Sequence, residues 1–345
     1  MKILITGASG FIGSFLCEEG LAQGHEVWAG VRKSSSRAYL KDSRLKFAQL
    51  DFADPQVLHG QLVDHATEHG GWDVVIHCAG VTKCLHPEDF ERNNYLYTRH
   101  LVEGCIRAGI KPRQWVYLSS LSVFGPIREE VAHAGFPKTS STLYAPIRET
   151  DEPCPNTAYG RSKLKAEKYL QQTALPVVIF RPTGVYGPRE RDYYLMAKSI
   201  KGHLDFAVGY RRQEITFIYV KDLAKAIFQA VAKEVVGRAY FVSEGGVYES
   251  RAFSDCIQRE LGNPWVLHIK APLWVLRLIS AVAGWGARLL GKVSTLNNDK
   301  YQIMKQRNWQ CDIRPLTDEL EFVPDYDLER GVRETIAWYK KEKWL

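Results

Sequence analysis

A chain of 345 residues with 45% hydrophobic residues has enough material for one large domain with a packed core and a smaller second domain. The formal net charge of +7 arises from 46 Lys and Arg against 39 Asp and Glu, and the basic residues are scattered along the chain. This scattering argues against nucleic-acid binding and fits a mild attraction to anionic cofactors or membrane surfaces.

A glycine-rich turn near the N-terminus separates a predicted strand from a predicted helix. Residues 3–5 form an apolar run, and apolar residues recur at helical spacing from Phe11 onward. Gly7 permits the tight turn, Gly10 lets a pyrophosphate approach the backbone, and Gly13 lets the helix pack against the strand. The pattern predicts a dinucleotide site with contacts from Gly7, Ser9, Gly10, Phe11, Ile12 and Gly13.

The second predicted strand, residues 25–32, ends at Arg32 and is followed by Lys33 and Ser34. An acidic residue at this point accepts hydrogen bonds from the ribose 2′-OH, whereas a cation and hydroxyls suit a 2′-phosphate. Because the acid is missing, we expect NADP(H) in preference to NAD(H), with Arg32 as the main contact and its two neighbours beside it. The alternative is an ordinary solvated basic loop.

The next two strands end in residues that suit the same cofactor. The third, residues 45–50, leads to a carboxylate that can accept the adenine amino group, and the fourth, residues 73–77, leads to small residues beside which a cofactor can pass. His77 closes the fourth strand and is interpreted as a buried structural histidine, although a general base is the alternative. The contacts expected at these strand ends are Asp51, Phe52, Cys78, Ala79 and Gly80.

The fifth predicted strand, residues 114–118, delivers a serine-rich turn, residues 119–125, to the same edge of the sheet, where substrates bind in open α/β sheets. Tyr159 and Lys163 lie four residues apart, so on a helix the phenol and the ammonium share one face. A free tyrosine has a pKa of about 10, but a neighbouring cation favours the phenolate. The pair therefore indicates acid–base chemistry beside the cofactor.

At this point the chain resembles the extended short-chain dehydrogenase/reductase family. The motifs that carry the resemblance lie at residues 6–13, 51–52, 77–80, 94, 119–125, 159–163, 181–188 and 219–223. The resemblance implies an α/β fold with a Rossmann-type doubly wound parallel sheet and a smaller C-terminal α/β substrate-binding domain. The expected cofactor domain is residues 1–182, completed by about 213–242, and the expected substrate cap is residues 183–212 and 243–345.

The resemblance also implies roles for single residues. Tyr159 is the expected catalytic acid or base, and Lys163 is expected to lower its pKa and hold the nicotinamide ribose. Ser120, five residues before the glycine that closes its motif, is expected to hydrogen-bond the reacting oxygen, and Asn94 to support a proton-relay water. Pro182 and Val185 are expected to pass under the nicotinamide.

The C-terminal run, residues 298–339, resembles the 3β-hydroxysteroid dehydrogenase and dihydroflavonol reductase branch, whose members act on bulky apolar alcohols or ketones. We therefore expect NADP(H)-dependent hydride transfer to or from a secondary alcohol or ketone on a steroid-like, flavonoid-like or keto-lipid substrate. A nucleotide-sugar epimerase or dehydratase with bound NAD is the main alternative, and a non-catalytic NADP-binding sensor or assembly subunit is another. A diphosphate could be held by Arg189, Arg191, Arg211 and Arg212.

A predicted helix over residues 271–290 is apolar nearly all round, with a thin stripe that includes Arg277 and Arg288. These arginines interrupt it too often for a bilayer span, which needs about 20 mostly apolar residues. Three interpretations stay open: burial in the cap, contact with another subunit, or a position on a membrane surface with Trp274 and Trp285 at the interface. A homodimer is the arrangement that the family resemblance implies.

Seven cysteines without a Cys-x-x-Cys pair are typical of reduced thiols and favour neither a disulfide framework nor a zinc site. The first predicted strand starts directly after Met1, without a signal peptide before it. We therefore expect a cytoplasmic protein, with a peripheral membrane position as the alternative, that holds no metal.

Overall fold

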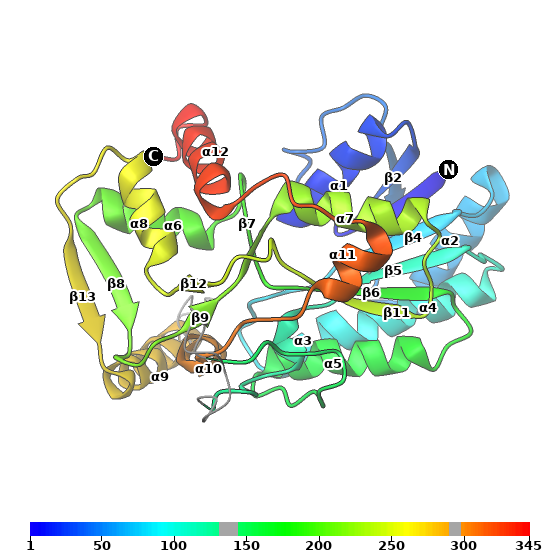
Figure 1. The fold of residues 1–345 in the computed structure, drawn as a ribbon. Coiled ribbons are helices and arrows are strands. Elements are labelled where there is room, and N and C mark those ends of the chain that lie inside the picture. The colour runs from blue at the N-terminus through cyan, green and yellow to red at the C-terminus, as the bar shows by residue number, and fades with distance from the viewer. Residues whose placement is uncertain (131–143, 290–297) are drawn as a thin grey trace. The chain divides into compact units, whose positions relative to one another are not determined.

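The computed structural model describes residues 1–130, 144–289 and 298–345 (Figure 1). The chain divides into two compact units. The first comprises Met1–Ser120, Ala158–Arg181 and Ala224–Tyr240, and the second comprises Leu121–Thr157, Pro182–Leu223 and Phe241–Leu345.

Among the described residues of the first unit, a seven-stranded sheet has the order β11, β6, β5, β4, β1, β2, β3 (Figure 1). The strands are β1 (Lys2–Thr6), β2 (Glu26–Val31), β3 (Lys46–Gln49), β4 (Val74–His77), β5 (Gln114–Leu118), β6 (Val177–Pro182) and β11 (Arg238–Val242). From β6 to β3 the neighbouring strands pair in parallel. The order reverses between β1 and β4, so the predicted doubly wound sheet is confirmed, and in such sheets ligands bind at that reversal, outside the carboxyl ends of the strands.

Helices cover both faces of this sheet (Figure 1). They are α1 (Phe11–Ala22), α2 (Pro55–His69), α3 (Glu88–Phe90), the π-helical η1 (Glu91–Leu96), α4 (Tyr97–Arg107), α5 (Ala158–Gln171) and α7 (Val220–Ala232). Helix α1 lies against α7, because a Cβ added to Gly20 of α1 would come within 3.0 Å of the Phe228 ring of α7. Helices α2, α4 and α5 lie on the opposite face, where their apolar residues form one core with the strands.

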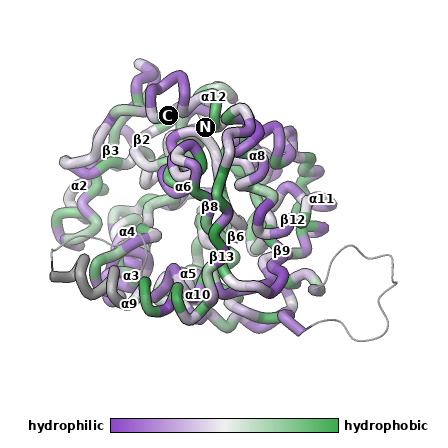
Figure 2. The backbone as a smooth tube through the Cα atoms, turned by 90° about the vertical axis from the view of Figure 1, so that its left-hand side faces the viewer, coloured by the Kyte–Doolittle hydropathy of each residue, from purple (hydrophilic) through white to green (hydrophobic). Residues whose placement is uncertain are grey.

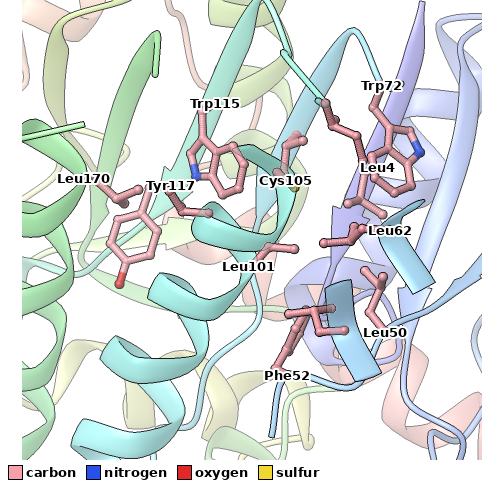
Figure 3. Packing of buried hydrophobic residues seen from close by; sticks show 14 of the residues in the cluster. Leu4, Leu50, Phe52, Leu62, Trp72, Leu101, Cys105, Trp115, Tyr117 and Leu170 are labelled. Carbon is pink, nitrogen blue, oxygen red and sulfur yellow. The ribbon is translucent and has the colours of Figure 1, made fainter. Parts of the chain in front are cut away.

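That core explains why these segments are strands and helices. Trp115 and Tyr117 point from β5 toward Leu101 of α4 and Leu170 of α5, and all four side chains are buried (Figure 3). A parallel sheet with helices on both faces needs nearly continuous apolar strands, which the 3–5 and 74–76 runs provide. The strand ends that carry the predicted site residues are therefore fixed by burial along the strands.

The second unit contains short strands and helices around its own apolar core. Its elements are η2 (Leu121–Val123), β7 (Gly184–Tyr186), α6 (Asp192–Lys201), β8 (Leu204–Val208), β9 (Glu214–Ile215), β10 (Phe217–Tyr219), β12 (Tyr248–Glu249), α8 (Ala252–Glu260), β13 (Leu267–Ala271), α9 (Leu273–Leu289), α10 (Asn298–Lys305), α11 (Arg314–Leu320) and α12 (Leu328–Lys341). Tyr186, Phe217 and Phe253 pack with Ile336 of α12 at its centre.

Residues 121–157 group with the second unit, although the sequence placed them in the cofactor domain. Their described part is joined to the C-terminal region: Ile147 forms a β-bridge with Cys311, and the Asn308 side-chain nitrogen donates to the Ala145 carbonyl at 2.9 Å. Residues 213–223 also group with the second unit. These contacts join residues far apart in the chain, so no local sequence pattern predicts them.

The apolar helix expected over residues 271–290 begins at Leu273, because Ala271 is the last residue of strand β13 and Pro272 lies between the two elements. Its residue 290 and the side chains from residue 282 onward, Trp285 and Arg288 included, lie outside the described side chains. Within the described part of the chain, no helix is both long enough and apolar enough to span a bilayer.

Candidate active site

The glycine turn between β1 and α1 depends on the absence of side chains. Gly7 has φ of 68°, and its carbonyl accepts from the Gly10 N–H at 2.9 Å. A Cβ on Gly7 would lie 2.8 Å from the Ala79 backbone, and one on Gly13 would lie 2.2 Å from the Gly7 oxygen. Gly10 is the N-cap residue of α1, and no described side chain caps the helix there. The first-turn N–H groups are therefore available to an anion.

The carboxyl ends of β1 and β4 are linked by hydroxyl groups. The Thr6 hydroxyl lies 2.7 Å from His77 Nδ1 and accepts from the Ala79 N–H at 3.2 Å. The other ring nitrogen of His77 lies 2.9 Å from the hydroxyl of Thr98 in α4. Burial, reinforced by the charge of Lys163, lowers the pKa of His77 to about 3. This histidine is a neutral structural link, which supports its interpretation as structural.

The end of β2 presents Arg32, Lys33 and Ser34, all of them exposed. Within the described part of the chain, the Arg32 guanidinium makes no hydrogen bond or ion pair, while its backbone N–H donates to the Ser35 hydroxyl at 2.9 Å. At the end of β3, Asp51 is exposed and its carboxylate accepts from the Ala53 N–H at 3.0 Å. Its neighbour Phe52 is buried, with its ring edge-on to His77 at 6.2 Å between centroids.

Ser120 and Tyr159 are brought together by β5 and α5. Their side chains share a hydrogen bond, which lowers the pKa of Tyr159, but burial has the larger effect and raises it to about 12. The Tyr159 ring stands edge-on to Phe90, with 6.1 Å between the centroids. Ser119 is buried in a different setting, with its N–H donating to the carbonyl at Phe180. The serine that the family resemblance selects, Ser120, is thus the one that is hydrogen-bonded to the phenol.

Lys163 lies at the carboxyl end of β5, beside the backbone of that strand. Its ammonium donates to the Leu118 carbonyl at 2.8 Å and lies 4.9 Å from the centroid of the Tyr117 ring. Burial lowers the pKa of Lys163 to about 8. Burial, the hydrogen bond with Ser120 and the nearby Cys78 together raise the pKa of Tyr159. The expected lowering of the Tyr159 pKa by Lys163 stays a prediction.

Asn94 lies in the π-helical turn η1, an irregularity that often occurs at functional sites. Its amide pairs with the Val81 backbone, accepting at 2.8 Å and donating at 3.1 Å, and also donates to the Ser162 hydroxyl at 3.0 Å. A Cβ on Gly80 would lie 2.9 Å from the Asn94 oxygen and 3.2 Å from Lys163 Nζ. The predicted residues Asn94 and Lys163 thus lie next to the backbone at Gly80, which is also a predicted residue. Ser162, which was not predicted, binds Asn94 in the same place.

A buried ion pair fixes the helix that carries Tyr159 and Lys163. Glu167, one turn further along α5, accepts from Arg181 of β6 at 2.7 Å (Nη2 to Oε2) and at 3.1 Å (Nε to Oε1). Both side chains are almost completely buried. Sequence reasoning missed this pair, although an Arg within an apolar strand and a Glu on the buried side of a helix are the residue types that demand partners.

The remaining predicted residues belong to the second unit. Pro182 ends β6, and Val185 lies in β7 opposite Ile218 of β10. Their expected position under the nicotinamide stays a prediction.

The four arginines considered for a diphosphate differ in their surroundings. Arg212 pairs with Glu214 at 3.2 Å and Glu249 at 3.5 Å, so its charge is already compensated by two carboxylates. Arg191 and Arg211 are exposed, and Arg189 is partly buried with φ of 76°. The ion pairs of Arg212 therefore join residues within the second unit.

Comparisons with known proteins agree with this geometry. A family model described as the NAD dependent epimerase/dehydratase family matches residues 3–243. A Bacillus subtilis protein named as the uncharacterized UDP-glucose epimerase YtcB is 29% identical over 77% of this chain and 89% of its own length. The sterol-4-alpha-carboxylate 3-dehydrogenase ERG26 of Saccharomyces cerevisiae is 23% identical over 98% of this chain and 97% of its own.

Among solved structures, the UDP-glucuronic acid 4-epimerase from Bacillus cereus in complex with NAD is similar, with a TM-score of 0.72 and 20% identity over 99% of both chains. At this level of identity the similarity shows the shared fold.

Proposed function

Since the chain belongs to the NAD-dependent epimerase/dehydratase family, whose members are NAD(P)-dependent enzymes of the extended short-chain type, we propose that it transfers a hydride between a nicotinamide and a secondary alcohol or ketone carbon. The substrate that we propose is hydrophobic: steroid-like, flavonoid-like or a keto-lipid. The hydrogen bond between Ser120 and Tyr159 carries this proposal. It places a proton donor beside a second hydroxyl at the edge of the sheet where ligands bind in this fold.

The glycine turn fits a dinucleotide, because side chains at Gly7 or Gly13 would collide with the neighbouring backbone and the first turn of α1 keeps N–H groups for a pyrophosphate. The bound dinucleotide supplies or accepts the hydride. In carbonyl reduction, the Tyr159 O–H proton moves to the substrate oxygen, which Ser120 orients, and alcohol oxidation reverses this transfer. Lys163, whose ammonium lies in the same site, is the proposed contact to the nicotinamide ribose.

We propose NADP(H) as the preferred cofactor because Arg32 and Lys33 are exposed at the end of β2, where an acid would favour NAD(H). Fluorescence titration should give tighter binding for NADPH than for NADH. A charged hydrogen bond contributes about 1.5–3 kcal/mol, so Arg32→Ala should weaken NADPH binding about 10- to 100-fold and leave NADH binding nearly unchanged. Lys41→Ala, an exposed cation in the same loop, is the matched control. Tighter binding of NADH by the wild-type protein would reject the preference.

The support for an apolar substrate is the resemblance of the C-terminal run and the nearly complete coverage of the yeast sterol-4-alpha-carboxylate 3-dehydrogenase. A second candidate, a nucleotide-sugar epimerase with retained NAD, is favoured by the similarity to the Bacillus subtilis protein. The two candidates differ in how the cofactor is used. An epimerase regenerates its NAD in every cycle, whereas the proposed oxidoreductase consumes a soluble nicotinamide nucleotide.

One experiment separates the two candidates. The nucleotide released from purified protein by denaturation is identified by chromatography, and NADPH and NADH oxidation is then measured with steroid, flavonoid, keto-lipid and nucleotide-sugar substrates. Stoichiometric consumption of NADPH with an apolar ketone supports the proposed function. Tightly bound NAD together with interconversion of UDP-sugars, without net nucleotide consumption, would replace it with the epimerase.

A further inference from the structure

Strands β8 and β13 of the second unit carry an exposed apolar face. They pair in parallel, with Leu204 opposite Leu267 and Phe206 opposite Ile269, so these four side chains share one side of the pair. Their exposed fractions are 38%, 48%, 58% and 37% in that order. Parallel sheets normally have both faces covered. An apolar face of a parallel pair that remains exposed therefore calls for a partner.

The opposite side of the same strands is occupied within the unit. Asp205, which alternates with Leu204 and Phe206, is buried, and its carboxylate accepts from the Ser254 hydroxyl of α8 at 3.3 Å. It also pairs with His268 Nδ1 at 3.0 Å. The strands are thus anchored on α8 through their polar side, and their apolar side points away from it.

Helix α9 extends the apolar surface directly after β13. Trp274 and Leu278 are 70% and 59% exposed, and their spacing of four residues puts them on one side of the helix, while Leu276 is buried. Of the three interpretations left open for this helix, burial in the cap does not account for these exposed side chains. The β8–β13–α9 surface is here defined as Leu204, Phe206, Leu267, Ile269, Trp274 and Leu278.

Basic residues outnumber acidic ones around this surface. Residues 193–212 and 261–281, which supply the surface and its flanks, contain six Lys and Arg and one acidic residue, the buried Asp205; of the six, Arg212 is paired with Glu214 and Glu249. Lys201, Lys270 and Arg277 are exposed among them, and strands β8 and β13 lie side by side in Figure 2. Each basic residue near an anionic bilayer contributes about 1 kcal/mol of attraction. A second copy of the same surface would instead bring like charges together.

From this combination we infer that the β8–β13–α9 surface docks peripherally on a lipid bilayer with anionic headgroups. Tryptophan is enriched at membrane interfaces, and Trp274 would sit there while the strand side chains enter the boundary of the acyl chains. The basic flanks would contact the headgroups. The inference is independent of the reaction, since it rests on exposed residues of the second unit and includes none of the predicted catalytic residues.

Vesicle co-sedimentation tests it. The wild-type chain should bind phosphatidylcholine vesicles that contain phosphatidylserine, bind pure phosphatidylcholine more weakly, and lose much of the anionic preference in high salt. The double variant Phe206→Ser/Ile269→Ser should bind at least about tenfold more weakly, because it removes apolar area that enters the bilayer. Val323→Ser, an exposed apolar residue of the second unit outside the surface, is the matched control and should bind like wild type.

A charge variant, Lys270→Glu/Arg277→Glu, keeps the test decisive if the apolar variant fails to fold. It should abolish the preference for anionic vesicles, with circular dichroism and the melting temperature as checks of folding. Wild-type protein that ignores anionic vesicles, or variants that bind as well as wild type, would overturn the inference. So would light scattering that shows a vesicle-indifferent dimer dissociating in the Phe206→Ser/Ile269→Ser variant, because a second copy would then cover this surface.

Discussion

Replacing Glu167 by Gln tests whether the buried ion pair holds helix α5 against strand β6. The substitution keeps the shape of the side chain but removes the carboxylate charge that faces the Arg181 guanidinium, which is almost completely buried. Breaking a buried pair in this way costs about 3–5 kcal/mol, and the lower end applies because the amide oxygen can still accept one hydrogen bond. The melting temperature of a unit of this size falls by about 2–4 °C per kcal/mol, so we expect a fall of roughly 5–12 °C.

The matched control is Glu103→Gln in α4, which breaks partly exposed pairs with Arg99 and Arg107, each one helical turn away. Each such pair contributes about 0.3–0.5 kcal/mol, so the control should change the melting temperature by less than about 4 °C. Thermal and urea unfolding of both variants measures the difference. Equal losses for the two glutamates would show that the Arg181 pair does not anchor the helix. The double variant Glu167→Leu/Arg181→Met should regain stability, because it removes both charges of this pair from the interior.

Three further predictions concern the site itself. Tyr159→Phe should lower kcat about 10²- to 10⁴-fold with little change in the Kd for NADPH, since the ring can still pack against Phe90; full turnover by this variant would contradict the assignment. Gly13→Ala places a Cβ 2.2 Å from the Gly7 carbonyl oxygen and should lose about 1–3 kcal/mol of stability together with cofactor affinity, whereas Gly60→Ala in α2, with no described atom within 4 Å of its added Cβ, should gain about 0.5–1 kcal/mol in urea unfolding. The pKa of Lys163 falls from 10.5 to about 8 on burial. Between these values the unfolded chain holds a proton that the folded chain has released, so stability rises with pH. The unfolding free energy of wild type minus that of Lys163→Met should therefore increase by up to about 3 kcal/mol across this range, and a constant difference would refute the shift.

The parts of the site that the sequence predicted are those set by local chemistry. The glycine turn follows from an apolar strand, three glycines and a helical period within residues 3–16, and the structure places each glycine where a side chain would collide or a turn is needed. The glycine turn thus depends on spacing along the chain, which a single sequence displays. Ser120, which hydrogen-bonds Tyr159, could be chosen among its neighbours only through the family resemblance.

The parts that the sequence did not predict depend on partners distant in the chain. The ammonium of Lys163 donates to the carbonyl of Leu118, 45 positions away, and the Asn94 amide donates to the hydroxyl of Ser162, 68 positions away. The π-helical turn that carries Asn94, residues Glu91–Leu96, shows no apolar period in the sequence. Strand β13 was not predicted either. Most of its side chains are exposed, so its sequence lacks the apolar pattern that is typical of a buried strand.

The protonation state of Tyr159 connects the electrostatics of the site with the direction of the reaction. A phenol whose pKa is about 12 keeps its proton at neutral pH, and the protonated form is the one that donates to a carbonyl oxygen as a hydride reaches the carbon. Alcohol oxidation needs the phenolate. Burial disfavours the phenolate, and the hydrogen bond with Ser120 offsets only part of this effect. The positive charge of an oxidised nicotinamide beside the ring would favour the phenolate by the ordinary rule for opposite charges. For the proposed hydride transfer, we therefore expect alcohol oxidation to depend on the positive charge of the oxidised cofactor more strongly than carbonyl reduction does.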